Sequence, residues 1–146
     1  MTDMTTEVYL GLGSNLGDRH TQLLTAIELL VQYVGRLVGC SSFFETEPWG
    51  FVSEHQFLNA VALFQTTLTP HELLAATQTI ERQMGRVHQQ TGIYEDRPID
   101  IDILLYGNET VNTPDLQIPH PRMQERDFVM QPLEELRKNM NQPGLF

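Results

Sequence analysis

The stretch DRPIDIDILLYG, from Asp96 to Gly107, alternates acidic and aliphatic residues and then becomes wholly apolar. In a β-strand successive side chains point to opposite faces, so the isoleucines share one face while Asp100 and Asp102 share the other. Two carboxylates about 5 to 6 Å apart repel each other by about 3 kcal/mol at an effective dielectric of about 20. The pattern leaves two interpretations open, a solvated polar face and a site in which Mg²⁺ relieves the repulsion.

The segments on either side of this strand read as connections. Residues 85–98, GRVHQQTGIYEDRP, have little apolar periodicity, and loops of this length are usually functional or disordered. After the strand, Gly107 and Asn108 predict a tight turn, with residues 109–113 as the hairpin partner of the strand. The strand is therefore expected to follow a long loop and to lead into a hairpin.

The remaining chain alternates strand and helix patterns. Residues 7–15 predict a strand, and Asp18 is a suitable N-cap for the helical periodicity that follows. Residues 37–47 and 57–68 predict two further strands. Thr69, Pro70 and Glu72 form a capping box that starts a helix to about Met84, with Gly85 as its stop. A proline-bounded loop with one helical turn precedes a short helix at 129–138.

The resulting order β-α-β-β-α-β is the split βαβ pattern. It predicts a ferredoxin-like α+β fold, with both helices on one face of an antiparallel sheet, an extra hairpin strand and short C-terminal helices. A length of 146 residues fits one domain with a substantial core, so residues 1–146 are expected to form a single domain.

Composition limits the partners of the chain. A formal net charge of -10 disfavours binding to nucleic acid or to an anionic membrane. The N-terminal residues lack the pattern of a secretory leader, and Cys40 is the only cysteine, which together predict a cytoplasmic protein. Five of the eight arginines lie between Arg82 and Arg126, a weak indication of a phosphorylated ligand that competes with the interpretation of plain surface charge.

The glycine-rich segment GLGSNLG, residues 11–17, does not match a dinucleotide-binding motif. Gly11, Gly13 and Gly17 have the spacing G-x-G-x-x-x-G, and no acidic residue for a ribose lies about 20 positions further on. We therefore interpret these glycines as a strand-to-helix turn.

Several aromatic and polar residues have two interpretations. Trp49, Phe57, Tyr94 and Phe128 lie in or beside expected loops, where they would either pack into the core or sandwich a flat heterocycle. Asn59 lies within an apolar strand, where its amide needs partners and serves either the core or a ligand.

Four segments taken together resemble the 6-hydroxymethyl-7,8-dihydropterin pyrophosphokinase family of folate biosynthesis. They are GLGSNLGDR, FLNAV, DRPIDIDILLYG and IPHPRMQERDF, in this order and spacing. The resemblance implies a ferredoxin-like fold and an Mg²⁺-dependent diphosphotransferase with two Mg²⁺ ions. It also implies transfer of pyrophosphate from ATP to the pterin hydroxymethyl group, with release of AMP.

The resemblance also implies roles for individual residues. Asp100 and Asp102 would bind the metals and, with Arg86 and Arg97, form the catalytic set. The ATP site would comprise Gln78, Glu81, Arg86, His88, Tyr94, Arg97, Ile103, Gln117, His120 and Arg126. The pterin site would comprise Thr46, Trp49, Phe57, Asn59, Tyr94, Asp100 and Phe128. The acceptor of the hydroxyl proton stays open between Asp100 and solvent.

Two rival functions have distinct signatures. A regulatory module would bind a small ligand without turnover, and a nucleotidyltransferase would release pyrophosphate instead of AMP. The chain is expected to act as a monomer, with a weak dimer as the alternative.

Overall fold

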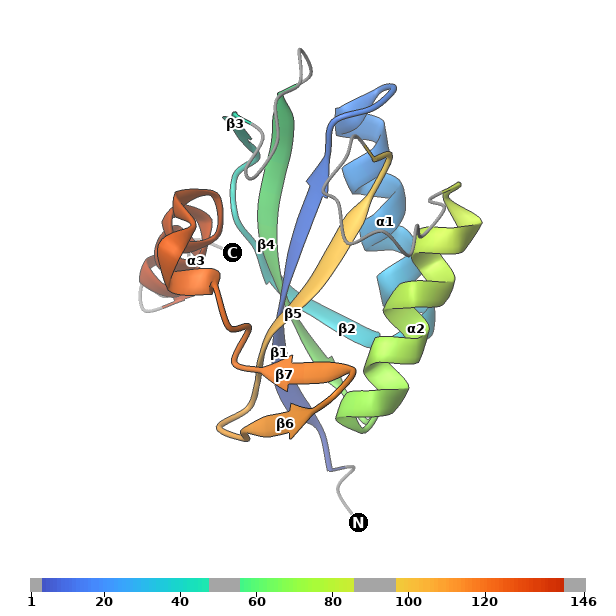
Figure 1. The fold of residues 1–146 in the computed structure, drawn as a ribbon, viewed down its shortest axis with the longest axis vertical. Coiled ribbons are helices and arrows are strands. Elements are labelled where there is room, and N and C mark those ends of the chain that lie inside the picture. The colour runs from blue at the N-terminus through green and yellow to red at the C-terminus, as the bar shows by residue number, and fades with distance from the viewer. Residues whose placement is uncertain (1–3, 48–55, 86–96, 141–146) are drawn as a thin grey trace.

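A computed structural model describes residues 4–47, 56–85 and 97–140 of the chain. This part of the protein has a mixed α/β fold with an antiparallel sheet and three α-helices (Figure 1). The strands are β1 (Thr6–Ser14), β2 (Gly35–Cys40), β3 (Phe44–Thr46), β4 (Phe57–Thr66), β5 (Asp100–Tyr106), β6 (Val111–Thr113) and β7 (Leu116–Ile118). The helices are α1 (Arg19–Tyr33), α2 (Pro70–Gln83) and α3 (Asp127–Met140), with a 3-10 turn η1 (Met123–Glu125).

The main sheet has the strand order β2-β4-β1-β5, and β3 pairs with β4 beside β2. All of its pairings are antiparallel. The register places Gly13 of β1 opposite Asn59 of β4 on one side and opposite Asp100 of β5 on the other. An amide, a glycine and a carboxylate therefore stand in one row across three neighbouring strands.

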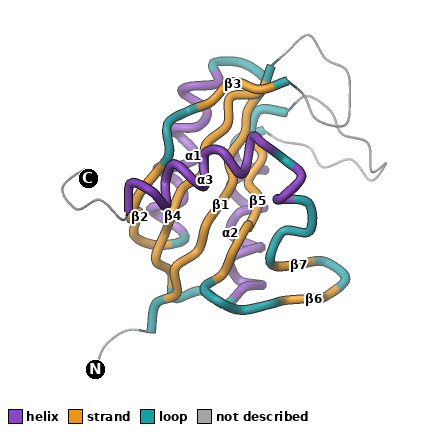
Figure 2. The backbone as a smooth tube through the Cα atoms, turned by 90° about the vertical axis from the view of Figure 1, so that its left-hand side faces the viewer, coloured by secondary structure: helices purple, strands orange, loops and turns teal. Residues whose placement is uncertain are grey.

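Helices cover both faces of this sheet. α1 and α2 lie against one face, and α3 crosses the other, as the two views show (Figures 1 and 2). The first face buries a large apolar core that includes Leu10, Leu23 and Ile80, while Leu104 and Leu136 belong to a second core beneath α3. Burial on both faces explains why nearly every residue of β4 is inaccessible to solvent. Among the described helices, none has the length and apolarity that crossing a bilayer requires.

The helix caps read from the sequence are confirmed. The Asp18 side chain accepts a hydrogen bond from the backbone N–H of Thr21 at 3.2 Å. Thr69 and Glu72 form the reciprocal capping box, with Pro70 at the first turn of α2. Gly85 follows the end of α2 with φ +94°, a conformation that suits glycine. Both helices thus begin where local chemistry places their starts, and α2 ends just before its predicted stop.

Two expected strands differ from the observed ones. The segment 37–47 is interrupted after Cys40, where Ser41 turns inward and its Oγ accepts the Val61 N–H at 2.9 Å. Of residues 109–113, only Glu109 joins the strand that precedes the turn, through an isolated bridge to Tyr106, whereas residues 111–113 pair with β7. The extra hairpin is therefore β6-β7, formed by residues later in the chain.

The glycines of residues 11–17 do not all form a turn, as the sequence had suggested. Gly11 and Gly13 lie inside β1, and only Gly17, with φ +69°, belongs to the turn before α1. A Cβ atom on Gly13 would lie 2.8 Å from Oδ1 of Asn59, whereas one on Gly11 would meet only Leu104 side-chain atoms at 3.5 Å or more. Glycine at position 13 leaves space for the amide of the neighbouring strand.

A bulge interrupts the pairing of β1 with β5. Tyr9 faces Leu105 and Leu10 faces Ile103, so Leu104 is an additional residue in β5. The alternation predicted at the start of the strand holds, because Ile101 and Ile103 pack in the core beneath α1 and α2. Beyond it, Leu104 packs under α3, and its carbonyl accepts the His120 N–H at 3.0 Å.

Candidate active site

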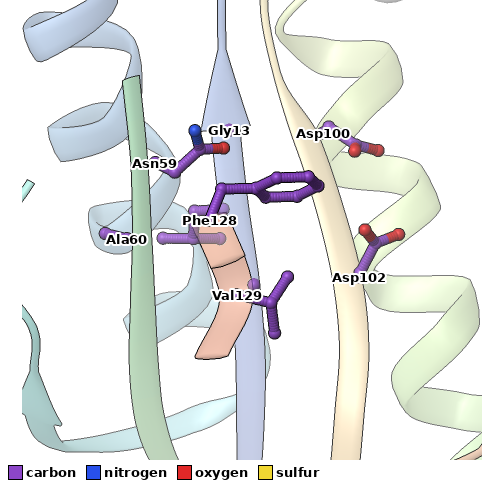
Figure 3. A pocket seen from close by; sticks show the side chains of 9 residues that line it. Gly13, Asn59, Ala60, Asp100, Asp102, Phe128 and Val129 are labelled. Atoms are coloured by element: carbon purple, nitrogen blue, oxygen red, sulfur yellow. The ribbon is translucent and has the colours of Figure 1, made fainter. Parts of the chain in front are cut away.

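A cleft lies on the α3 side of the sheet, over the row formed by Asn59, Gly13 and Asp100 (Figure 3). Its floor comes from β1, β4 and β5, and Phe128 and Val129 at the start of α3 close one side. It is lined by Gly11, Leu12, Gly13, Asn59, Ala60, Asp100, Asp102, Phe128 and Val129. The cleft thus combines an amide, two carboxylates and an aromatic ring.

The two aspartates point from β5 toward the same space (Figure 3). Their side chains are 24% and 29% exposed, so a ligand from solvent can reach both. Among the described residues, no group of three or more His, Cys, Asp or Glu side chains could hold a metal ion. Two carboxylates fit Mg²⁺, which usually binds one or two protein carboxylates and completes its shell with water or ligand oxygens.

Each aspartate faces an arginine that is itself largely buried. Nη1 of Arg97 lies 3.4 Å from Oδ2 of Asp100. Nη1 of Arg126 lies 4.0 Å from Oδ2 of Asp102. The arginine residues are 8% and 6% exposed, respectively. Two anionic groups are thus matched by two cationic groups at the edge of one cleft.

Both arginines also lie over aromatic rings. The guanidinium carbon of Arg97 is 5.5 Å from the centre of the Phe57 ring, and that of Arg126 is 5.5 Å from the centre of the Phe128 ring. Such cation–π contacts restrict the planar guanidinium groups. The structure therefore brings together residues that the sequence predicts to bind metal, phosphate and pterin.

The predicted pterin residues Thr46 and Asn59 contact each other directly. Nδ2 of Asn59 donates to Oγ1 of Thr46 at 2.6 Å, which joins β4 to the short strand β3. Asn59 is 4% exposed and lines the cleft. The amide is thus held in one orientation by a neighbouring strand, and its contact with a ligand stays a prediction.

A second pocket adjoins the first and shares Asp102 with it. It lies between α2, β5 and the segment around β7, and it contains the predicted ATP residues Ile103, Gln117 and His120. Its lining is Leu74, Ile101, Asp102, Ile103, Pro114, Asp115, Leu116, Gln117, His120 and Pro121. Because Asp102 lines both, this largely apolar pocket lies next to the aspartate pair.

His120 has a lowered pKa in this position. Burial is the largest cause, and the Arg126 cation adds to it, while the Asp100 carboxylate opposes it. Because the ordinary value is about 6.5, the imidazole is neutral at pH 7. A neutral ring can donate from one nitrogen and accept at the other.

Two further predicted ATP residues lie on α2 in different surroundings. Gln78 is exposed. Glu81 is 3% exposed, and its Oε2 accepts the backbone N–H of Ile101 at 2.8 Å. Glu81 therefore supports the strand between the two aspartates, and its contact with ATP stays a prediction. Trp49, Arg86, His88 and Tyr94 fall outside the described residues.

Some residues of this region were not singled out from the sequence. Leu74 and Leu116 wall the second pocket, but single leucines in amphipathic segments carry no signal of ligand binding. Asn15 is 2% exposed, and its side chain accepts a hydrogen bond from the Arg97 backbone. An amide in a glycine-rich segment could have signalled such a contact, because a buried amide needs hydrogen-bond partners.

Comparison with known proteins places the chain in a family. Residues 9–138 match the family model described as 7,8-dihydro-6-hydroxymethylpterin-pyrophosphokinase (HPPK). A Porphyromonas gingivalis 2-amino-4-hydroxy-6-hydroxymethyldihydropteridine pyrophosphokinase is 54% identical over 131 residues, which cover 88% of this chain and 89% of the relative. The Bacillus subtilis protein of the same name is 45% identical over 129 residues, or 88% of this chain and 76% of that protein.

Solved structures agree with the sequence matches. A Plasmodium falciparum HPPK-DHPS crystal structure has a TM-score of 0.74 at 19% identity, over 92% of this chain and 41% of that longer chain. This likeness defines the class of fold as a mixed α/β architecture shared with that structure. The chain belongs to the 7,8-dihydro-6-hydroxymethylpterin-pyrophosphokinase family, which confirms the resemblance seen in the sequence.

Proposed function

We propose that the chain transfers pyrophosphate from ATP to the hydroxymethyl group of 6-hydroxymethyl-7,8-dihydropterin, with release of AMP, in tetrahydrofolate biosynthesis. Family membership over residues 9–138 and the names of relatives at 42–54% identity support this reaction. The structural observation that carries it is that Asn59, Phe128 and the aspartate pair line the same cleft. Amide, aromatic and carboxylate groups there suit a heterocycle next to a metal-bound phosphate.

The pterin occupies the part of the cleft between β4 and α3. Asn59 offers an amide to the edge of the heterocycle, and its bond to Thr46 fixes which way that amide faces. Phe128 covers the cleft from α3, and Phe57 lies beneath the Arg97 guanidinium. Trp49 and Tyr94 belong to the same proposal on the strength of the sequence pattern. Aromatic faces and one fixed amide give both affinity and orientation to a flat ring.

The donor set of Asp100 and Asp102 fits Mg²⁺, since both side chains are carboxylates, partly exposed and aimed at one space. Two Mg²⁺ ions bound there would neutralise charge on the triphosphate. Before a ligand arrives, Arg97 and Arg126 balance the two carboxylates. Both guanidinium groups then lie where phosphate oxygens must enter, and they hold the moving group together with Arg86.

ATP places its base in the second pocket. The apolar side chains of Leu74, Ile103 and Leu116 suit an adenine ring, and Gln117 and His120 offer polar groups at its edge. Asp102 lines both pockets, so a triphosphate that leaves the nucleoside pocket passes the aspartates before it reaches the pterin. Gln78, Glu81 and His88 complete the proposed ATP site.

The chemical step is a substitution at the β-phosphorus by the pterin hydroxyl oxygen, with AMP as the leaving group. In this class of reaction a protein contributes mainly positioning and charge neutralisation. The described residues supply both, because rigid strands carry the aspartates and Asn59, and the two arginines are held against aromatic rings.

The same proposal covers the organisation of the chain. The strand order β2-β4-β1-β5 with antiparallel pairing supports a ferredoxin-like split βαβ arrangement, in which β3 and the β6-β7 hairpin are additions. Residues 1–146 act as one catalytic domain, in the cytoplasm, and as a monomer. Size-exclusion chromatography with light scattering tests the monomer, since a dimer would have twice the mass of 16.7 kDa.

The nucleotide product decides between functions. Protein, Mg·ATP and hydroxymethyldihydropterin are mixed, and nucleotides are separated by anion-exchange chromatography. AMP that forms only with pterin present supports the proposal. Pterin-dependent pyrophosphate would indicate a nucleotidyltransferase, ADP would indicate a simple kinase, and binding without turnover would indicate a regulatory module.

A further inference from the structure

Asn15 and Arg97 are joined by two hydrogen bonds, both of which involve the backbone of Arg97. The backbone N–H of Arg97 donates to Oδ1 of Asn15 at 2.7 Å, and the backbone N–H of Asn15 donates to the Arg97 carbonyl at 3.1 Å. The two residues are 2% and 8% exposed. Neither bond belongs to the β1-β5 ladder, which ends where Gly13 faces Asp100.

The sequence explains why a side chain is needed here. Pro98 follows Arg97 and has no N–H, so regular pairing with β1 cannot continue through that position. Oδ1 of Asn15 takes the place of a backbone carbonyl and accepts the last N–H before the proline. Without this acceptor a buried N–H would lose its partner, which is costly.

The position of the Arg97 guanidinium depends on the position of the Arg97 backbone. Its guanidinium lies 3.4 Å from Asp100 Oδ2 and over the Phe57 ring, at the edge of the cleft. We infer that Asn15 is a positioning residue for the transfer reaction, which sets the Arg97 guanidinium by fixing the Arg97 backbone. This inference rests on the phosphate role proposed for Arg97. A displacement of about 1 Å at such a group can lower a rate about 100-fold.

The test is a double-mutant cycle of Asn15→Ala and Arg97→Ala, with kcat/KM for Mg·ATP as the readout. Arg97→Ala removes the guanidinium but keeps the backbone N–H that Asn15 binds. We expect Asn15→Ala to lower kcat/KM about 10- to 100-fold in the wild-type chain and less than about 3-fold in the Arg97→Ala chain. Asn15→Asp, which keeps an acceptor oxygen, should recover most of the loss.

Thr66→Val is the matched control. Oγ1 of Thr66 also accepts a partly buried backbone N–H, from Leu68 at 3.1 Å, and it donates to the Val34 carbonyl at 2.7 Å. Thr66 lies at the opposite end of β4 from Asn59. Both variants should lower Tm by about 3 to 8 °C, because each removes a buried side-chain group that is hydrogen-bonded to the backbone. Thr66→Val should keep kcat/KM within about twofold of wild type. Asn15→Ser takes the place of Asn15→Ala in the cycle if the alanine variant does not fold.

Amide exchange gives a readout that is independent of turnover. The Arg97 N–H should exchange at least about tenfold faster in Asn15→Ala than in Asn15→Asp or Thr66→Val. Equal losses of kcat/KM in both Arg97 backgrounds, or an Asn15→Ala enzyme as active as Thr66→Val, would overturn the inference. Near wild-type activity of Arg97→Ala would instead refute the phosphate role of Arg97, so the two failures are distinguishable.

Discussion

Glu81 accepts the backbone N–H of Ile101 at 2.8 Å, from beneath the strand position that separates Asp100 from Asp102. β5 is an edge strand of the main sheet, so its outward N–H groups need partners other than a neighbouring strand. A buried carboxylate on α2 supplies one. This hydrogen bond holds α2 against β5 at the residue between the two aspartates.

Glu81→Ala should lower the free energy of unfolding by about 1 to 3 kcal/mol, because it leaves the Ile101 N–H buried without this acceptor. Glu81→Gln keeps an acceptor oxygen and should lose less. Urea denaturation measures both variants. Equal stability of the alanine and glutamine variants would show that the hydrogen bond does not hold the strand.

Asp100→Asn and Asp102→Asn should each fold and lose at least about 100-fold in kcat at saturating Mg²⁺, since an amide is a poor ligand for this cation. Chelation of Mg²⁺ with EDTA should abolish turnover of the wild-type chain. Glu109→Gln is the control, because it removes the same charge from an exposed residue outside both pockets. A near wild-type rate in either variant would refute metal binding by the aspartate that was replaced.

Gly13→Ala should raise the KM for the pterin about tenfold or more, because the new Cβ would lie 2.8 Å from Asn59 Oδ1 and displace the amide. Gly11→Ala is the comparison variant, because Gly11 lines the same cleft but its new Cβ meets Leu104 side-chain atoms at ordinary contact distance instead of Asn59. Steady-state kinetics with varied pterin separates the two. An equal KM in both variants would contradict a role for Asn59 at the pterin.

His120 should titrate below pH 6.5, because burial and the Arg126 cation lower its pKa more than Asp100 raises it. The unfolded state, with an ordinary histidine pKa, takes up the proton first as the pH falls. The contribution of His120 to stability is therefore complete above about pH 6.5 and is lost as the pH falls through its folded pKa. An NMR titration of the imidazole against His120→Gln locates the midpoint, and a value at or above 6.5 would refute the prediction.

Local chemistry in the sequence was sufficient for the helix starts at Asp18 and Thr69 and for the alternation at the start of β5. These features depend on residues within one turn or one strand, so no tertiary information was needed. The four motifs in register then identified the family, which the comparisons confirm.

Features that depend on contacts between distant segments could not be read in the same way. The glycine at position 13 suggested a turn, because only the register with β4 reveals the neighbouring Asn59 amide. Residues 109–113 looked like a partner for β5, but residues 111–113 pair with Leu116–Ile118 of β7, and only Glu109 bridges to Tyr106 of β5. The place of α3 on the second face follows from a core that spans β4 and β5, not from its own amphipathic pattern.

The additional residue in β5 links the architecture of the sheet to the second pocket, which His120 lines. Since the Leu104 carbonyl holds the His120 N–H while its side chain packs under α3, deleting this one residue would restore a regular ladder and at the same time detach the histidine. A redesign of the second pocket must therefore keep an insertion in β5 that sheet stability alone would not select.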